Sequence, residues 1–84
     1  MQTGYVVKSL KGHDANRIYL VLAVLSADFI LLADGQYRKI ENPKQKRIKH
    51  VKILSEQRHD FECDSDIRKI CRQYDRKEIG RAHV

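Results

Sequence analysis

Short apolar runs separated by turn-forming residues dominate the first 54 positions of the chain. Tyr5–Ser9 is a β-branched run, and Arg17–Leu25 is an almost unbroken apolar run. A third run, Phe29–Ala33, follows the turn residues at 26–28. Runs of this kind, bounded by Gly, Asn, Asp and Ser, predict β-strands. The second run does not alternate between apolar and polar residues, which predicts a strand buried on both faces.

Two further strands are predicted after residue 33. Asp34-Gly35 favours a type I′ hairpin, because that turn needs positive φ at both central positions. We therefore predict a return strand at Tyr37–Glu41, followed by a basic loop at Lys44–Lys49 and a fifth strand at His50–Leu54. Five short strands joined by tight turns predict a mainly β fold, a small closed barrel over residues 1–54.

The pattern becomes helical after the predicted barrel. Residues 55–63 are mostly polar and predict a linker. Apolar side chains then recur at helical spacing, at Ile67, Ile70, Cys71 and Tyr74. Asp64 or Ser65 can cap the first turn, since a side-chain oxygen accepts a backbone amide proton there. We predict a short amphipathic helix over residues 64–77.

The last seven residues, 78–84, match the translation of a common sequencing adapter. We expect them to be a non-native tail and exclude them from functional reasoning, as for a cloning scar. The charges of Glu78 and Arg81 cancel, so this exclusion leaves the net charge unchanged.

The net charge of +6 is confined to one part of the chain. Residues 36–52 contain seven Lys or Arg residues and one acidic residue, whereas the remainder is neutral. The seven are Arg38, Lys39, Lys44, Lys46, Arg47, Lys49 and Lys52. Such a concentration is typical of a surface that binds a polyanion. The alternative is a solvated surface that keeps a small protein soluble.

The segment GYVVKSLKGHDANRIYLV, residues 4–21, resembles a KOW motif in its initial glycine, its strand, its glycine-containing loop and its second apolar strand. Through residue 54 the chain is similar to bacterial KOW-domain RNA-binding proteins. These resemble the large-subunit ribosomal proteins of the fourteen-e, six-e and twenty-seven-e group. Asn16 stands where many relatives have glycine, and Asn tolerates the left-handed backbone region that such a loop needs.

The resemblance implies an SH3-like barrel of the translation-protein type, binding to RNA, and no catalysis. It also implies ribosomal RNA and ribosomal proteins as partners. The loop role is carried over to Lys11, Gly12 and His13. Tyr37 could stack on a base or instead pack into the barrel wall. Together with the charged segment, the candidate RNA-binding residues are Lys8, Lys11, Gly12, His13, Arg17, Tyr37, Arg38, Lys39, Lys44, Lys46, Arg47, Lys49 and His50.

Enzymatic and metal-binding functions have little support in the sequence. No glycine-rich phosphate loop, nucleophile elbow or HExxH motif is found. The zinc-ligand types His50, His59, Cys63 and Cys71 have spacings that fit no structural zinc site. Asp64 and Asp66 are better explained as charges at a helix N-terminus. We therefore expect no cofactor and no metal.

A protein-interaction module is the alternative function, because SH3-like barrels also bind peptides and the basic helix could dock on a partner. Peptide grooves need several exposed aromatics, and only Tyr37 and Tyr5 are candidates. DNA binding is less favoured, because no helix carries groove-reading polar residues. Residues 1–4 lack signal-peptide features, and the longest apolar run, 18–25, is too short for a membrane span. With two cysteines in no CxxC pattern, we expect a cytoplasmic, monomeric protein.

Overall fold

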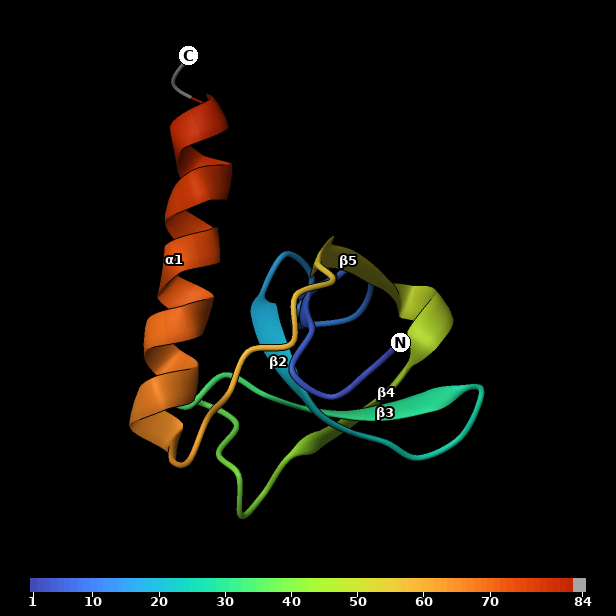
Figure 1. The fold of residues 1–84 in the computed structure, drawn as a ribbon. Coiled ribbons are helices and arrows are strands. Elements are labelled where there is room, and N and C mark those ends of the chain that lie inside the picture. Colours follow the sequence, from blue (N-terminus) through green and yellow to red (C-terminus); the bar gives the residue numbers. More distant parts are fainter. Residues whose placement is uncertain (83–84) are drawn as a thin grey trace.

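The computed structural model describes residues 1–82, with side chains described up to residue 75. Within this range the fold is mainly β, with one antiparallel five-stranded sheet and one C-terminal helix (Figure 1). The elements are β1 (Val6–Ser9), β2 (Ile18–Val24), β3 (Phe29–Ala33), β4 (Lys44–Arg47), the 3-10 helix η1 (Ile48–His50), β5 (Val51–Ser55) and α1 (Asp64–Ala82). The strand order is β4-β3-β2-β1-β5, so β4 and β5 are the two edges of the sheet and η1 joins them.

Most of the predicted elements are confirmed. The first three strands and the last one lie within one residue of their predicted positions. The helix begins at Asp64 as predicted and continues beyond residue 77 to Ala82. The last two residues of the predicted tail, 83 and 84, lie outside the described residues.

The two faces of the sheet each carry an apolar cluster, as the unbroken run in β2 predicts. Successive side chains of a strand point to opposite faces. Tyr19 and Val21 therefore pack with Ile30 on one face, whereas Ile18 and Leu20 belong to the cluster on the other face. Burial on both faces explains why β2 lacks polar positions.

Helix α1 covers one of these faces. Figure 1 shows it beside β2, with its C-terminal end extending past the sheet. Ile67 and Cys71 of the predicted stripe are buried against β1 and β2, and Ile70 and Tyr74 pack at the margin. The helix is amphipathic, and no helix in residues 1–82 has the length and apolar character needed to cross a membrane.

The predicted strand at Tyr37–Glu41 is wrong, and these residues form turns instead. The reason is that side-chain carboxylates accept the amide protons that a strand would use for pairing. Asp34 Oδ1 accepts hydrogen bonds from the backbone N–H of Gln36 (2.9 Å) and Arg38 (2.8 Å). Asp64 Oδ1 accepts one from the backbone N–H of Ile40 (2.8 Å).

The type I′ turn predicted at Asp34-Gly35 is also wrong. Gly35 has a φ of 78°, but Asp34 does not have a positive φ. Gly35 is buried under the start of α1, where an added Cβ would overlap with the backbone oxygen of Asp64 and lie 2.8 Å from the backbone nitrogen of Arg68. The absence of a Cβ at Gly35 thus allows the chain to pass directly beneath the helix.

The actual fourth strand is Lys44–Arg47, which the sequence predicted to be a loop. It pairs with β3, with Phe29 opposite Arg47 and Leu32 opposite Lys44. Lys44 and Lys46 are partly buried, whereas Gln45 and Arg47 are exposed. The strand therefore alternates like any edge strand, but its inward positions are lysines.

Candidate nucleic-acid interface

The loop between β1 and β2 is tightly folded by backbone hydrogen bonds. The N–H of Asn16 donates to the carbonyl of Ser9 (2.7 Å), and the N–H of Ser9 donates to the carbonyl of Arg17 (2.9 Å). Gly12 has a φ of 89° and Asn16 a φ of 74°. The predicted left-handed conformations are thus confirmed at both positions, and Asn16 takes the conformation that glycine adopts most readily.

A buried carboxylate, Asp14, attaches this loop to β4. Its Oδ1 accepts hydrogen bonds from Ser9 Oγ (3.0 Å) and Lys46 Nζ (2.8 Å). Its Oδ2 accepts one from the Tyr19 hydroxyl (3.1 Å) and lies 2.9 Å from Lys44 Nζ. Four donors on β1, β2 and β4 therefore converge on one side chain. We call this group the Asp14 cluster.

The charge on Asp14 is strongly favoured by its neighbours. Desolvation alone would raise the pKa of Asp14. The hydrogen bonds from Lys46, Lys44 and Ser9 outweigh it and hold that pKa well below the usual range. Desolvation and the adjacent carboxylate raise the pKa of Tyr19 to about 12, so its hydroxyl remains a donor. The ion pairs consequently persist throughout the physiological pH range.

Two candidate RNA-binding residues, Lys44 and Lys46, therefore belong to the Asp14 cluster. Their side chains are 27% and 9% exposed, and Lys46 Nζ also donates to the carbonyl of Lys11 (2.7 Å). The sequence did not indicate Asp14 as a partner. The only signal available was the spacing of two lysines on one face of a short segment, opposite an acidic residue in a loop.

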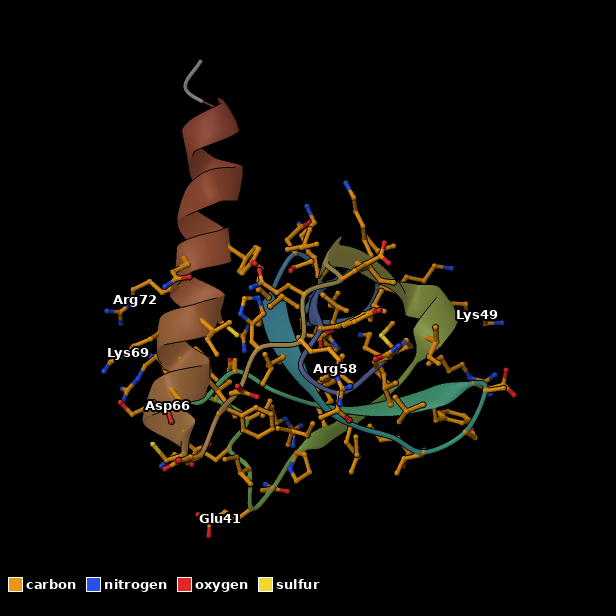
Figure 2. The ribbon with its side chains drawn as sticks, in the orientation of Figure 1. Glu41, Lys49, Arg58, Asp66, Lys69 and Arg72 are labelled. Carbon is orange, nitrogen blue, oxygen red and sulfur yellow. The ribbon has the colours of Figure 1, made fainter. Side chains whose placement is uncertain are left out.

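The other basic candidates near the loop remain directed toward solvent. Lys11, His13, Arg47 and Lys49 are exposed, and Lys49 projects from the end of the molecule farthest from α1 (Figure 2). Lys8 of β1 is the cross-strand partner of Lys52 on β5.

We call a group of six residues from the β1–β2 loop, η1 and the three strands β1, β4 and β5 the basic edge: Lys8, Lys11, Arg47, Lys49, His50 and Lys52. His50 lies in the positive electrostatic potential of the surrounding lysines and Arg47. Desolvation lowers the pKa of His50, and so do the charges of Lys11, Lys49, Lys46 and Arg47.

The remaining candidates lie on another part of the surface, close to α1. The guanidinium carbon of Arg17 lies 4.4 Å from the centroid of the Tyr37 ring. Tyr37 is 67% exposed, so it does not pack into a barrel wall. Arg38 is half-buried and Lys39 exposed in the same turn region. The structure thus separates most of the predicted residues into the basic edge, the Asp14 cluster and this third group, while Gly12 and His13 lie in the β1–β2 loop outside all three.

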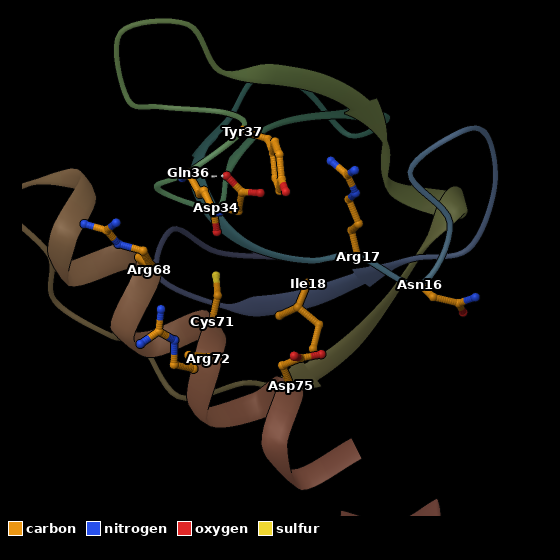
Figure 3. A pocket seen from close by; sticks show the side chains of 10 residues that line it. All are labelled: Asn16, Arg17, Ile18, Asp34, Gln36, Tyr37, Arg68, Cys71, Arg72 and Asp75. Carbon is orange, nitrogen blue, oxygen red and sulfur yellow. Dashed lines mark hydrogen bonds between the residues drawn. The ribbon is translucent and has the colours of Figure 1, made fainter. Parts of the chain in front are cut away.

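A groove of about 250 Å³ separates this third group from α1 (Figure 3). Arg17, Ile18 and Tyr37 contribute to it from one side. Arg68, Cys71 and Arg72 contribute to it from the helix. The arginines of α1 were not among the predicted site residues, since on the sequence they form only the polar face of a helix.

Two of the candidate zinc ligands, His59 and Cys63, and Asp66 of the acidic pair form side-chain hydrogen bonds. His59 Nε2 lies 2.9 Å from the Tyr74 hydroxyl, and Cys63 Sγ lies 3.6 Å from Asp66 Oδ2. Asp66 Oδ2 also accepts the backbone N–H of Glu62 (3.0 Å). In the part of the chain that the structure describes, no three His, Cys, Asp or Glu side chains are grouped closely enough to hold a metal ion.

No family model and no curated protein matches this chain. The functional inference therefore depends on the residues that resemble a KOW motif and on the geometry of the basic edge, the Asp14 cluster and the groove.

Proposed function

We propose that this chain is a non-catalytic RNA-binding protein of the KOW type that contacts RNA phosphates through the basic edge. The observation that supports this most is the convergence of Lys11, from the β1–β2 loop, with Lys49 of η1, since the backbone N–H of Leu10 in that loop donates to the carbonyl of His50 in η1 (2.9 Å). Lys11 and Lys49 are almost forty positions apart in sequence, and the Asp14 cluster holds their two segments together. A preorganised group of cations suits the phosphate backbone, whose neutralisation provides most sequence-independent affinity.

The fold supports the same proposal. The strand order β4-β3-β2-β1-β5, with η1 between the two edge strands, suits an SH3-like barrel. The register shifts between Val6 and Val7 and between Val21 and Ala23 favour closure, because bulges bend strands. We propose a barrel of this type, with the KOW loop at one end next to the basic edge.

The biological setting that we propose follows from the resemblance. Ribosomal RNA is the proposed ligand, ribosomal proteins are the proposed neighbours, and the protein is proposed to act as a monomer in the bacterial cytoplasm. The structure supplies cations but few amide or aromatic groups on the basic edge. Binding there should consequently depend weakly on base sequence.

A peptide-binding module receives less support than RNA binding. Its groove would require several exposed aromatic side chains. Tyr37 is exposed, but Tyr5, the second candidate, is buried in the apolar cluster. An aromatic groove for a proline-rich peptide is thus lacking among the described side chains.

The test is a salt titration of RNA binding for a variant with two fewer cations on the basic edge, Arg47→Gln with Lys49→Gln. Each phosphate contact contributes about 0.7 to the slope of log affinity against log salt for single strands. We expect the slope to flatten by about 1.4 if both residues contact phosphates.

The matched control removes two exposed cations elsewhere, Arg58→Gln with Lys69→Gln (Figure 2). We expect its slope to equal that of the unmodified protein. Equal slopes for all three proteins, with every variant folded, would show that the basic edge is only a solvated surface.

A further inference from the structure

The exposed ring of Tyr37 lies on a rigid turn. Asp34 Oδ1 fixes that turn through the backbone N–H groups of Gln36 and Arg38. The stacked guanidinium of Arg17 fixes the ring from one side. A large, exposed aromatic that is held in place provides a stacking surface without a loss of side-chain entropy on binding.

The floor of the groove beside this ring is apolar. Ile18 and Cys71 are almost fully buried, and the sulfur of Cys71 points toward the groove (Figure 3). Burial raises the pKa of the Cys71 thiol to about 12, so the thiol is neutral at physiological pH. A flat, uncharged ring can cover such a floor without leaving a charge desolvated.

The far side of the groove is cationic. Arg68 and Arg72 are exposed on α1, across the groove from Tyr37 (Figure 3). Asp34 and Asp75 also line the groove, and together with Arg17, Arg68 and Arg72 they leave a net charge of +1 among its lining side chains. Arginine presents planar donors that match phosphate oxygens. The arginines of α1 are therefore suited to a phosphate attached to a base that lies on Tyr37.

The size of the groove limits what it can hold. Its volume of about 250 Å³ is below the roughly 300–1,000 Å³ typical of pockets for drug-sized ligands. It is open at the surface and continuous with Arg17, the last residue of the β1–β2 loop. A single RNA strand bound to the basic edge could thus follow that loop to the groove.

We infer that this groove receives one unstacked nucleotide of a single-stranded RNA, with the base on the Tyr37–Arg17 pair and a phosphate on Arg68 and Arg72. The inference rests on the proposed function and adds a preference for single strands over duplexes. Bases in a duplex are stacked on one another and are not available to Tyr37.

The experiment compares two probes, a short oligouridine and an RNA duplex of the same length, with unmodified protein and the variant Tyr37→Leu. Loss of one stacked base reduces affinity by roughly 5- to 150-fold. We expect that loss for the oligouridine and a change of less than about twofold for the duplex. Tyr37→Phe keeps the ring and should retain the affinity for the oligouridine.

Two controls separate stacking from charge and from folding. Leu25→Ala removes an exposed apolar side chain from the β2–β3 turn and should leave both affinities unchanged. Arg68→Gln with Arg72→Gln should flatten the salt slope for the oligouridine by about 0.7 if one phosphate is lost. Tyr37 is exposed, so the melting temperature of Tyr37→Leu should stay close to that of the unmodified protein.

The outcomes distinguish the two proposals. If unmodified protein binds both probes and Tyr37→Leu binds oligouridine equally well, the groove is not a nucleotide site, while RNA binding by the basic edge stands. Equal losses for duplex and oligouridine would also overturn the groove, because stacking cannot explain them. If unmodified protein binds neither probe, the proposed function itself is wrong.

Discussion

Lys46 and Arg47 are adjacent in β4, but their side chains lie in different environments. Lys46 is 9% exposed and bonded to Asp14. Arg47 is exposed, with its guanidinium carbon 5.0 Å from the centroid of the Phe29 ring. The pleat of the strand produces the difference, since successive side chains point to opposite faces. One basic segment therefore contains residues that hold the loop in place and residues that remain available to a ligand.

The net charge counted from the sequence is therefore larger than the positive charge that is exposed to a ligand. Residues 36–52 carry the whole excess of +6, but Lys44 and Lys46 share the carboxylate of Asp14. A desolvated lysine needs such a partner, because an unpaired buried charge is costly. An exposed lysine or arginine needs none.

The largest effect is expected for Asp14→Asn, which leaves two lysines without their carboxylate. Removing one partner of a buried ion pair typically costs about 3–5 kcal/mol. Because Lys44 is partly exposed, we expect the free energy of unfolding to fall by about 3 kcal/mol. Urea denaturation measures this, with Asp28→Asn as the control at an exposed turn. A loss below about 1 kcal/mol would mean that the Asp14 cluster does not hold the loop.

The adjacent pair Lys46→Gln and Arg47→Gln should give opposite results. Lys46→Gln removes a charged hydrogen bond and should lower the free energy of unfolding by about 2 kcal/mol, with a nearly unchanged salt slope for RNA. Arg47→Gln should flatten that slope by about 0.7 and change stability by less than about 1 kcal/mol. Denaturation and salt titration of both variants provide the measurement. Identical behaviour of the two would remove the distinction between the inward and outward faces of β4.

Gly12→Val tests whether the conformation of the loop presents Lys11 correctly. A β-branched residue at a φ of 89° is strained, and such strain costs about 1–3 kcal/mol. A Cβ at Gly12 would lie 3.4 Å from Asp14 Oδ1, an ordinary contact, so the cost comes from the backbone. Thermal melts should therefore show destabilisation, with weaker RNA binding. Asn16→Gly keeps positive φ accessible and serves as the control; equal melts for both variants would contradict the argument.

The stability should also depend on acid pH, an effect that vanishes at neutral pH. The pKa of Asp14 is lower in the folded than in the unfolded protein, where it is about 3.9. The stabilisation from this ionised carboxylate is complete above that pH and is lost as the pH falls below it. The unfolding free energy should then fall by up to about 1.4 kcal/mol per pH unit more steeply than in Asp14→Asn. Denaturation of both proteins between pH 5 and pH 2 should show the difference narrowing, and a constant difference would contradict it.

Much of the fold follows from local sequence signals. Phe29–Ala33 is a strand at its predicted bounds, and α1 begins at Asp64, just before the apolar stripe that predicts it, although the Asp64 carboxylate accepts the backbone N–H of Ile40 and not one of the first turn. The positive φ angles of Gly12 and Asn16 follow from residue type. These features depend on neighbours in the sequence, and for that reason the sequence is sufficient to predict them.

The errors arise where a side-chain carboxylate, near or distant in the sequence, decides the structure. Lysine has a low strand propensity, so the sequence of β4 does not predict a strand. The contact that favours it, from Lys46 to Asp14, joins residues 32 positions apart. Tyr37–Glu41 has the composition of a strand, but the backbone N–H groups in and next to this segment donate to the carboxylates of Asp34 and Asp64 and not to a neighbouring strand. The groove was missed for the same reason, because it exists only where α1 meets the turn at Tyr37.

The contact of Gly35 with α1 also determines how adaptable the groove is. Backbone meets backbone there, since an added Cβ would lie 2.8 Å from the nitrogen of Arg68. No side chain at this point can change rotamer to let the helix move closer or to compensate for a shift. The helix and the turn therefore cannot lie closer together than they do. Any residue larger than glycine at position 35 would push α1 away from the turn. Position 35 is accordingly the place where one methyl group could change the width of the groove without altering any residue that lines it.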